Sequence, residues 1–157
     1  HMVGHVEHLG PEAANEYVNK AVMREAVVMQ MTWVGAPTIY YGDEAGVCGF
    51  TDPDNRRTYP WGFEDKELIE FYRKLGKVRA MLPDEILGET YFDDDLELVH
   101  FVRVNGGKRL DVYVNNSPNA IKRSLDGRLV DMWTDKVVRD EITVEPYGFA
   151  VLKNAEK

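Results

Sequence analysis

Charged and aromatic residues gather in one stretch of the sequence, between Gly35 and Gly62, which reads GAPTIYYGDEAGVCGFTDPDNRRTYPWG. Carboxylates, guanidinium groups and flat rings are side chains that hold polar ligands by hydrogen bonds and ring contacts. Asp52 and Arg56 stand four residues apart, and the spacing alone favours a surface ion pair that contributes little to stability. The stretch is nevertheless the first candidate for a binding site in this sequence.

Other groups that could do chemistry have plainer interpretations. The segment 52–56 lacks the glycine and the distal glutamate of an EF-hand calcium loop. The acidic run 93–95 is interpreted as a solvated turn because no histidine accompanies it, and His100 as a packing or surface residue. Cys48 is the single cysteine and has no basic neighbour, which favours an inert thiol. The sequence therefore predicts no metal site and no cofactor.

Composition excludes several classes of partner. The chain has 157 residues, a net charge of -8 and 44% hydrophobic residues, which suits one or two globular units with a core. The acidic balance argues against nucleic acid, because nothing would neutralise a run of phosphates. No apolar stretch approaches the roughly 20 residues of a membrane-spanning helix, and no leader pattern stands at the start. We therefore predict a cytoplasmic protein without a membrane partner.

The first half of the sequence predicts part of an α/β layout. Residues 11–33 read as one long helix with apolar residues around much of its surface. Residues 35–42 predict a short strand without polar alternation, as in a parallel sheet covered on both faces. A long loop over 43–64 leads to a second helix that Asp65 would cap and that would run to about Leu82. A lone parallel strand lacks its neighbours, so we expect the chain to be one part of something longer.

The second half predicts a small antiparallel β-sandwich. Pro83 ends the second helix, and beyond residue 87 apolar residues alternate with polar ones. The two clearest strands cover 96–104 and 108–116 and are joined by an Asn-Gly-Gly turn. Weaker strands are predicted at 129–134, 142–146 and 148–153. The predicted fold class is thus an α/β fragment over 1–86 followed by an all-β domain over 87–157.

The stretch that opens this section resembles the end of the catalytic barrel in the α-amylase family of glycoside hydrolases. GAPTIYYGDE at 35–44 is similar to the eighth barrel strand, and DPDNRRTYPW at 52–61 to the loop that follows it. The likeness is greatest for neopullulanase, cyclomaltodextrinase and maltogenic amylase. EPYGFAVLK at 145–153 and VYVNNS at 112–117 are similar to strands of their C-terminal domain. The resemblance implies that 1–86 is the last helix–strand–helix part of a TIM barrel.

The resemblance also implies a reaction for a parent enzyme. Such enzymes hydrolyse or transfer α-1,4 or α-1,6 glucosidic bonds with retention, using a nucleophilic carboxylate and a carboxylic acid about 5 Å apart. The family places its three catalytic groups after barrel strands four, five and seven, the last within an N-H-D motif. That motif does not occur in this sequence. No residue is therefore assigned as catalytic, and we expect this chain to be inactive alone.

What the resemblance does assign is a rim that binds α-glucan oligosaccharides. Active sites of such barrels lie at the C-terminal ends of the strands, where this loop begins. The family aspartate and arginine that match Asp52 and Arg56 would exchange hydrogen bonds with sugar hydroxyls. Aromatic residues of the loop would offer flat faces to a sugar ring, and the strand-end motif would shape the pocket wall. The implied substrate-binding residues are Asp52, Arg56, Tyr59, Trp61, Tyr41 and Glu44.

Two alternatives remain open at this point. The β-sandwich could hold starch by itself, through the exposed aromatics of a binding module, because fold alone does not imply function. Its candidate residues are Tyr91, Phe92, Tyr113 and Trp133. The chain could also be a purely structural or assembly fragment, whose exposed barrel strand would favour a homo-oligomer.

Overall fold

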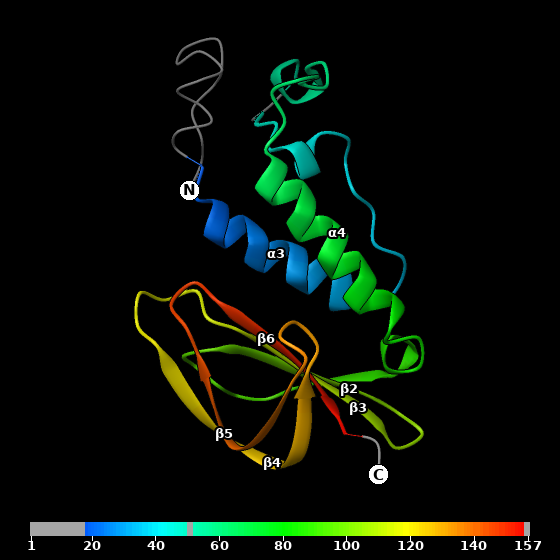
Figure 1. The fold of residues 1–157 in the computed structure, drawn as a ribbon, viewed down its shortest axis with the longest axis vertical. Coiled ribbons are helices and arrows are strands. Elements are labelled where there is room, and N and C mark those ends of the chain that lie inside the picture. Colours follow the sequence, from blue (N-terminus) through cyan, green and yellow to red (C-terminus); the bar gives the residue numbers. More distant parts are fainter. Residues whose placement is uncertain (1–17, 50–51, 156–157) are drawn as a thin grey trace.

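The computed structural model describes residues 18–49 and 52–155 as two helices lying on one face of a curled sheet (Figure 1). The helices are α3 (Lys20–Thr32) and α4 (Lys66–Ala80). Short 3-10 turns stand at η1 (Asp43–Ala45), η2 (Asp54–Arg56) and η3 (Glu85–Leu87). Among the described residues, no helix is long and apolar enough to cross a membrane.

Six strands form one antiparallel sheet with the order β1-β2-β3-β6-β4-β5. They are β1 (Glu89–Phe92), β2 (Val99–Asn105), β3 (Lys108–Val114), β4 (Ile121–Asp131), β5 (Lys136–Val144) and β6 (Phe149–Asn154). The register of β4 against β5 shifts between Ser124 and Arg128, and only the last residues of β4 pair with β6. This bulge lets the sheet curl, which confirms an antiparallel β-domain.

The central strand β3 is covered on both faces. Its residues Leu110, Val112 and Val114 face the helices and are fully or almost fully buried. Tyr113 lies in a second cluster with residues of β4, β5 and β6, on the opposite face. The helices and the sheet therefore share one hydrophobic core, while the curl of the sheet encloses another. The helix-side core also includes Val28, Met31, Leu68, Leu75, Val78, Phe101 and Val151.

The prediction of the second helix is confirmed, whereas that of the first helix is only partly correct. Asp65 caps α4 as predicted, because its Oδ1 accepts a hydrogen bond of 3.0 Å from the Leu68 amide. The prediction of an uninterrupted first helix is wrong at Asn19, which has extended dihedrals of φ -78° and ψ 94°. The Asn19 side chain accepts hydrogen bonds from the amides of the first turn of α3, so it starts a new helix there. Residues 11–17 of the predicted helix lie outside the described residues.

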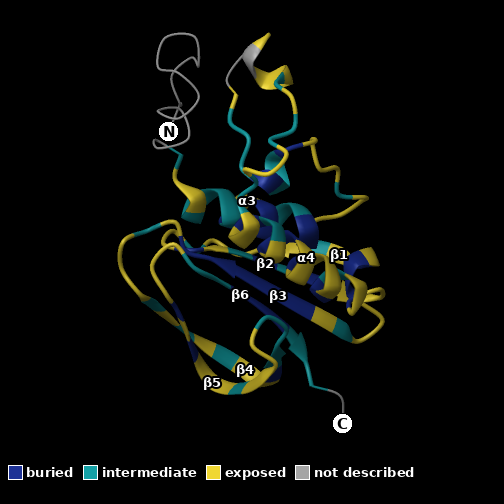
Figure 2. Cartoon of the chain, turned by 45° about the horizontal axis from the view of Figure 1, so that its top comes forward, coloured by how far each residue is buried: buried dark blue, intermediate teal, exposed yellow. Residues whose placement is uncertain are grey.

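The predicted strand over 35–42 is not a strand in this structure. No regular secondary structure is assigned there, and Ile39, Tyr40 and Tyr41 are 43–47% exposed (Figure 2). The segment is held instead by a side chain of α3, because Gln30 Nε2 donates to the carbonyl of Thr38 at 2.6 Å. A strand needs a neighbour to complete its ladder, and no described segment supplies one.

Two arginines attach the C-terminal end of α3 to the rest of the molecule. Arg103 of β2 is fully buried, and its guanidinium donates to the carbonyl oxygens of Thr32, Ile86 and Gly88. Arg79 of α4 donates to the carbonyls of Met31 and Gly35, both at 2.6 Å. Since α3 has no basic residue in its own last turn, these guanidinium groups satisfy carbonyls that the helix leaves unpaired. Burial and the nearby positive charge of Arg79 lower the pKa of Arg103.

Candidate functional site

The loop with most of the predicted site residues projects beyond the N-terminal end of α4, away from the sheet (Figure 1). Its base is tightly built. Gly42 and Gly46 have φ of 92° and 78°, and a Cβ on Gly42 would lie 2.9 Å from Val47 Cγ2. The carbonyl of Ala45 accepts a hydrogen bond from the Asp65 amide at 3.0 Å, which fastens the loop to the cap of α4. The loop is thus presented from a fixed base.

Asp52 and Arg56 form the ion pair that their spacing predicts. Arg56 Nη2 lies 2.8 Å from Asp52 Oδ2, and the two side chains are 63% and 62% exposed. The pair flanks the turn η2, where the Arg56 amide donates to the carbonyl of Pro53. Both charged groups therefore face solvent, in reach of a ligand, and their role in binding sugar stays a prediction.

Tyr59 and Trp61 form an aromatic pair on the same loop. Their ring centroids are 4.6 Å apart at an interplanar angle of 51°, and Trp61 is 79% exposed. Desolvation and the carboxylates of Glu44 and Glu64 raise the pKa of Tyr59. An exposed indole beside a tyrosine hydroxyl offers a flat apolar surface with a polar edge.

Tyr41 connects the beginning of the loop to its later part, and Glu44 holds the turn at its beginning. The Tyr41 hydroxyl donates to the carbonyl of Arg57 at 3.0 Å, so it bridges the two halves of the loop. Glu44 Oε2 accepts from the Gly42 amide at 3.0 Å and thereby fixes the turn η1. A hollow of about 220 Å³ opens beside them, lined by Tyr40, Asp43 and other residues of the loop. Burial and the charge of Glu44 raise the pKa of Asp43.

The structure brings the predicted site residues together in pairs, not as one cluster. The charged pair and the aromatic pair share no hydrogen bond within the described residues. Tyr40 lines the same hollow as Asn55 of the turn η2. Burial and the neighbouring Tyr41 raise the pKa of Tyr40. Tyr40 was not among the predicted site residues, but it is 47% exposed, and its ring lies tilted against that of Tyr41 with 4.8 Å between centroids. The double tyrosine of the motif was the signal that could have added it to the site.

The interpretation of the acidic run 93–95 as a solvated turn is correct for Asp93 and Asp94, which are exposed, but wrong for Asp95. Asp95 is largely buried and accepts two hydrogen bonds from Arg123, at 2.6 and 2.8 Å. Asp93 pairs with His100, whose other ring nitrogen lies 3.2 Å from Asp111. Arg123 lies 28 residues from Asp95 in the sequence, so local composition could not reveal that contact. Across 18–49 and 52–155, no group of three His, Cys, Asp or Glu side chains is placed to hold a metal ion.

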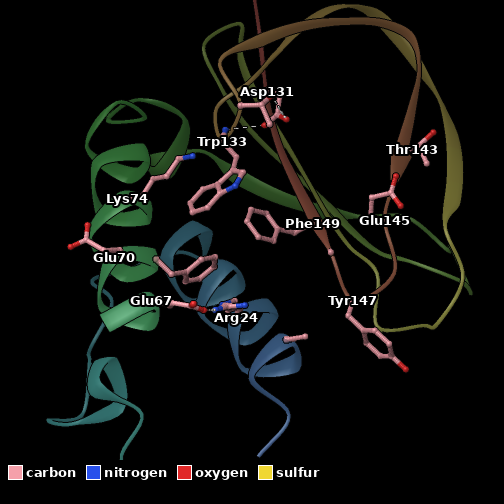
Figure 3. A pocket seen from close by; sticks show the side chains of 14 residues that line it. Arg24, Glu67, Glu70, Lys74, Asp131, Trp133, Thr143, Glu145, Tyr147 and Phe149 are labelled. Atoms are coloured by element: carbon pink, nitrogen blue, oxygen red, sulfur yellow. Dashed lines mark hydrogen bonds and ion pairs between the residues drawn. The ribbon is translucent and has the colours of Figure 1, made fainter. Parts of the chain in front are cut away.

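Sequence reasoning missed a wider hollow of about 640 Å³ between the helices and the β-domain (Figure 3). Phe71 of α4 and Trp133 of the β4–β5 turn line it, together with charged residues of α3 and α4. Phe71 was not among the predicted site residues, and Trp133 was named only as a candidate aromatic of a starch-binding sandwich. The hollow depends on long-range packing, and no local sequence signal marks it.

Comparisons with known proteins agree with this architecture. Residues 95–154 match the family described as Beta-galactosidase C-terminal domain. The amylopullulanase of Thermoanaerobacterium saccharolyticum is 35% identical over 143 residues, which cover 86% of this chain and 11% of that protein. Neopullulanase 2 of Thermoactinomyces vulgaris is 42% identical over 105 residues, which cover 62% of this chain and 18% of that protein. The chain thus spans only a small part of the length of the curated relatives it matches.

Solved structures point to the same group. The α-amylase of Anoxybacillus superposes with a TM-score of 0.80 and 26% identity, over 94% of this chain and 36% of that one. The maltogenic amylase of S. marinus gives a TM-score of 0.71 at 26% identity, over 92% of this chain and 20% of that one. By sequence and by fold, this chain is therefore a relative of the C-terminal region of α-amylase-family glycoside hydrolases.

Proposed function

We propose that this chain is the C-terminal part of an α-glucan-acting glycoside hydrolase, and that its loop supplies part of the sugar-binding rim. The observation that carries the proposal is the pair of exposed groups on one fixed loop: the Asp52–Arg56 ion pair and the Tyr59–Trp61 ring pair. A carboxylate accepts and a guanidinium donates, so together they can bind adjacent hydroxyls of one sugar. Relatives named amylopullulanase and cyclomaltodextrinase support the substrate class.

In this proposal α3, the segment 36–41 and α4 are the end of a TIM barrel, with a boundary to the β-domain near residue 86. The exposed row at Ile39, Tyr40 and Tyr41 supports it, because a neighbouring barrel strand would cover such residues. Alternatively, a second copy of the chain could cover these exposed residues. Light scattering separates the two: a monomer at micromolar concentration favours an intramolecular barrel neighbour, and a dimer favours the second copy.

The chemistry of the parent enzyme would be retaining, and this chain would bind sugar without breaking bonds. The two carboxylates of such a mechanism stand about 5 Å apart and lie on barrel strands whose motifs are missing from this sequence. The residues of the loop would orient a glucose ring and help to exclude water from it. We therefore expect that the pure chain does not hydrolyse maltooligosaccharides or pullulan.

The test combines turnover with binding. Maltoheptaose titrated into the chain should shift the indole N–H signal of Trp61 in NMR spectra. Replacing Asp52 by alanine should weaken that response about tenfold, because a hydrogen bond to a charged group contributes about 1.5 kcal/mol or more. The matched control is Glu141→Ala, which removes an exposed ion-paired carboxylate on β5, outside the loop. Hydrolysis by the pure chain that survives Asp52→Ala would defeat the proposal.

A further inference from the structure

The wider hollow lies where the two parts of the molecule meet. Its helix side is formed by α3 and α4, and its sheet side by the β4–β5 and β5–β6 turns (Figure 3). The volume of about 640 Å³ lies within the range of sites that hold small organic ligands. It shares no lining residue with the Asp52–Arg56 or the Tyr59–Trp61 pair. It is therefore a separate candidate site.

Three aromatic rings form the floor of this hollow. Trp133 of the β4–β5 turn lies 5.1 Å from Phe71 of α4 and 5.2 Å from Phe149 of β6, between ring centroids. Phe71 and Phe149 meet at 5.8 Å in an edge-to-face arrangement. Lys74 places its Nζ 4.0 Å from the centre of the Trp133 ring. The floor thus offers apolar surface for the C–H groups of a ligand, with one cation beside it.

The walls carry polar groups of both signs. Arg24, Glu67 and Lys74 project from the helices, and Thr143, Glu145 and Tyr147 from the sheet side (Figure 3). Within the described part of the chain, the side chains of Thr143, Glu145 and Tyr147 make no hydrogen bond. Mixed donors and acceptors around an apolar floor suit a neutral ligand with many hydroxyl groups better than an anion or a cation.

The sheet-side wall is fixed before any ligand arrives. Asn115 is fully buried and donates from Nδ2 to the carbonyls of Val144 and Glu145, both at 3.0 Å. The Gly148 amide closes the turn by donating to the carbonyl of Glu145 at 3.0 Å. Tyr147 is held at a φ of 52°, a left-handed conformation that costs free energy for a residue with a side chain. A preorganised wall lowers the entropic cost of binding.

We propose that this hollow is a second carbohydrate site, which holds a short stretch of α-glucan at the junction of the helices and the β-domain. The choice of α-glucan as ligand rests on the proposed function; the hollow and its lining do not. Such a site would keep a polymeric substrate attached to the enzyme while the catalytic site acts on another part of the same chain. If the β-domain binds starch, as the first alternative from the sequence holds, this hollow would be the binding site and Trp133 its central aromatic residue.

The three tryptophans of the chain make the proposal testable in one experiment. The indole N–H signals of Trp33, Trp61 and Trp133 are assigned by Trp→Phe variants and followed while maltoheptaose is added. We expect a saturable shift of the Trp133 signal with a Kd near 1 mM, which corresponds to about 4 kcal/mol. Tyr147→Ala and Glu145→Gln should weaken this response at least fivefold and leave the Trp61 response unchanged. Glu141→Gln, which changes an exposed carboxylate on β5 outside the hollow, is the matched control.

Each outcome decides between the two sites. If Trp61 responds and Trp133 does not, up to about 10 mM ligand, the second site is overturned and the rim stands. A response of Trp133 alone supports the second site and defeats the rim. Silence of both signals overturns both proposals. An equal response of Trp133 to cellohexaose, a β-linked glucan, would contradict the α-glucan assignment. Unchanged dispersion of the remaining NMR signals confirms that each variant is folded.

Discussion

The loop over 43–64 keeps its central ion pair in solvent, whereas the β-domain also buries charged side chains. In the loop, Asp52 and Arg56 pair with each other and remain more than 60% exposed. In the β-domain, Arg103 and Asp111 are completely or almost completely buried, and their polar atoms are bonded on several sides. An exposed pair loses little when one partner changes, whereas a buried one leaves unpaired groups behind. The charged groups of the loop are therefore available to a ligand, whereas the buried charged groups of the β-domain stabilise the fold through fixed polar contacts.

The largest effect is expected for Arg103→Met. The substitution keeps much of the apolar volume but leaves the carbonyls of Thr32, Ile86 and Gly88 without their buried donor. Each unsatisfied buried acceptor costs about 1–3 kcal/mol, so the free energy of unfolding should fall by about 3 kcal/mol or more. Urea denaturation, with an m-value that the substitution leaves unchanged, measures this loss in the free energy of unfolding. Arg56→Met in the loop should change it by less than about 0.5 kcal/mol, and equal losses for both variants would remove the contrast between the regions.

A smaller loss is expected for Asn115→Ala. The Asn115 amide donates to three carbonyls, those of Asn119, Val144 and Glu145, and holds the β5–β6 turn. We expect a loss of about 2 kcal/mol in the free energy of unfolding, measured in the same way. Asn105→Ala is the control, because its single amide bond to the Asp84 carbonyl is exposed. A variant of Asn115 as stable as the control would show that the turn holds without the amide.

The third prediction concerns pH. Although burial opposes it, hydrogen bonds and charges of Asp111 and Asp93 raise the pKa of His100. A raised pKa means that the stabilisation is complete below about pH 6.5 and is lost as the pH rises through the folded-state pKa. The free energy of unfolding should thus decline on the alkaline side of that range, as followed by urea denaturation. His100→Gln should flatten the decline, and a decline of the same size in that variant would assign it to other groups.

The smallest effect separates the two kinds of ion pair directly. A double-mutant cycle on Asp52 and Arg56 should give a coupling free energy below about 0.5 kcal/mol. The same cycle on Asp95 and Arg123, whose side chains are 12% and 26% exposed, should give a clearly larger value. The Arg123 bond also holds the pKa of Asp95 far below its usual range. Similar couplings in the two cycles would mean that exposure does not explain the difference.

Local patterns in the sequence predicted elements whose determinants are also local. The alternation over 108–116 and the Asn-Gly-Gly turn correctly indicated β3 and its hairpin, with Gly106 and Gly107 at φ of 53° and 88°. The cap at Asp65 was equally visible. The strand predicted over 35–42 failed because a strand depends on neighbours, and the apolar pattern says nothing of whether they are present. The missed cap at Asn19 shows that an asparagine inside an apolar helix pattern can start a helix.

The two candidate sites also differ in whether their determinants are local in the sequence. The residue types of the loop could be named from motif spacing, and Asp52 and Arg56 do form a pair. Their use by a ligand remains a prediction, since no contact in the structure tests it. The second hollow was beyond sequence reasoning, because Phe71 and Trp133 are distant in sequence and meet only when α4 packs on the sheet. Periodicity predicts that such residues are buried, but it does not predict which ones meet.

The attachment of α3 uses oxygens that every amino acid carries. Arg79 and Arg103 donate hydrogen bonds to main-chain carbonyls at the end of α3, so these bonds do not depend on the side chains at those positions. The side chain of Val34 could therefore change to suit a different neighbouring segment, and the junction would keep its geometry, whereas Gly35 is favoured by its φ of 89°. Residues on the surface of the helices and residues of the β-domain can then change independently, because two guanidinium groups hold the two parts together through the main chain.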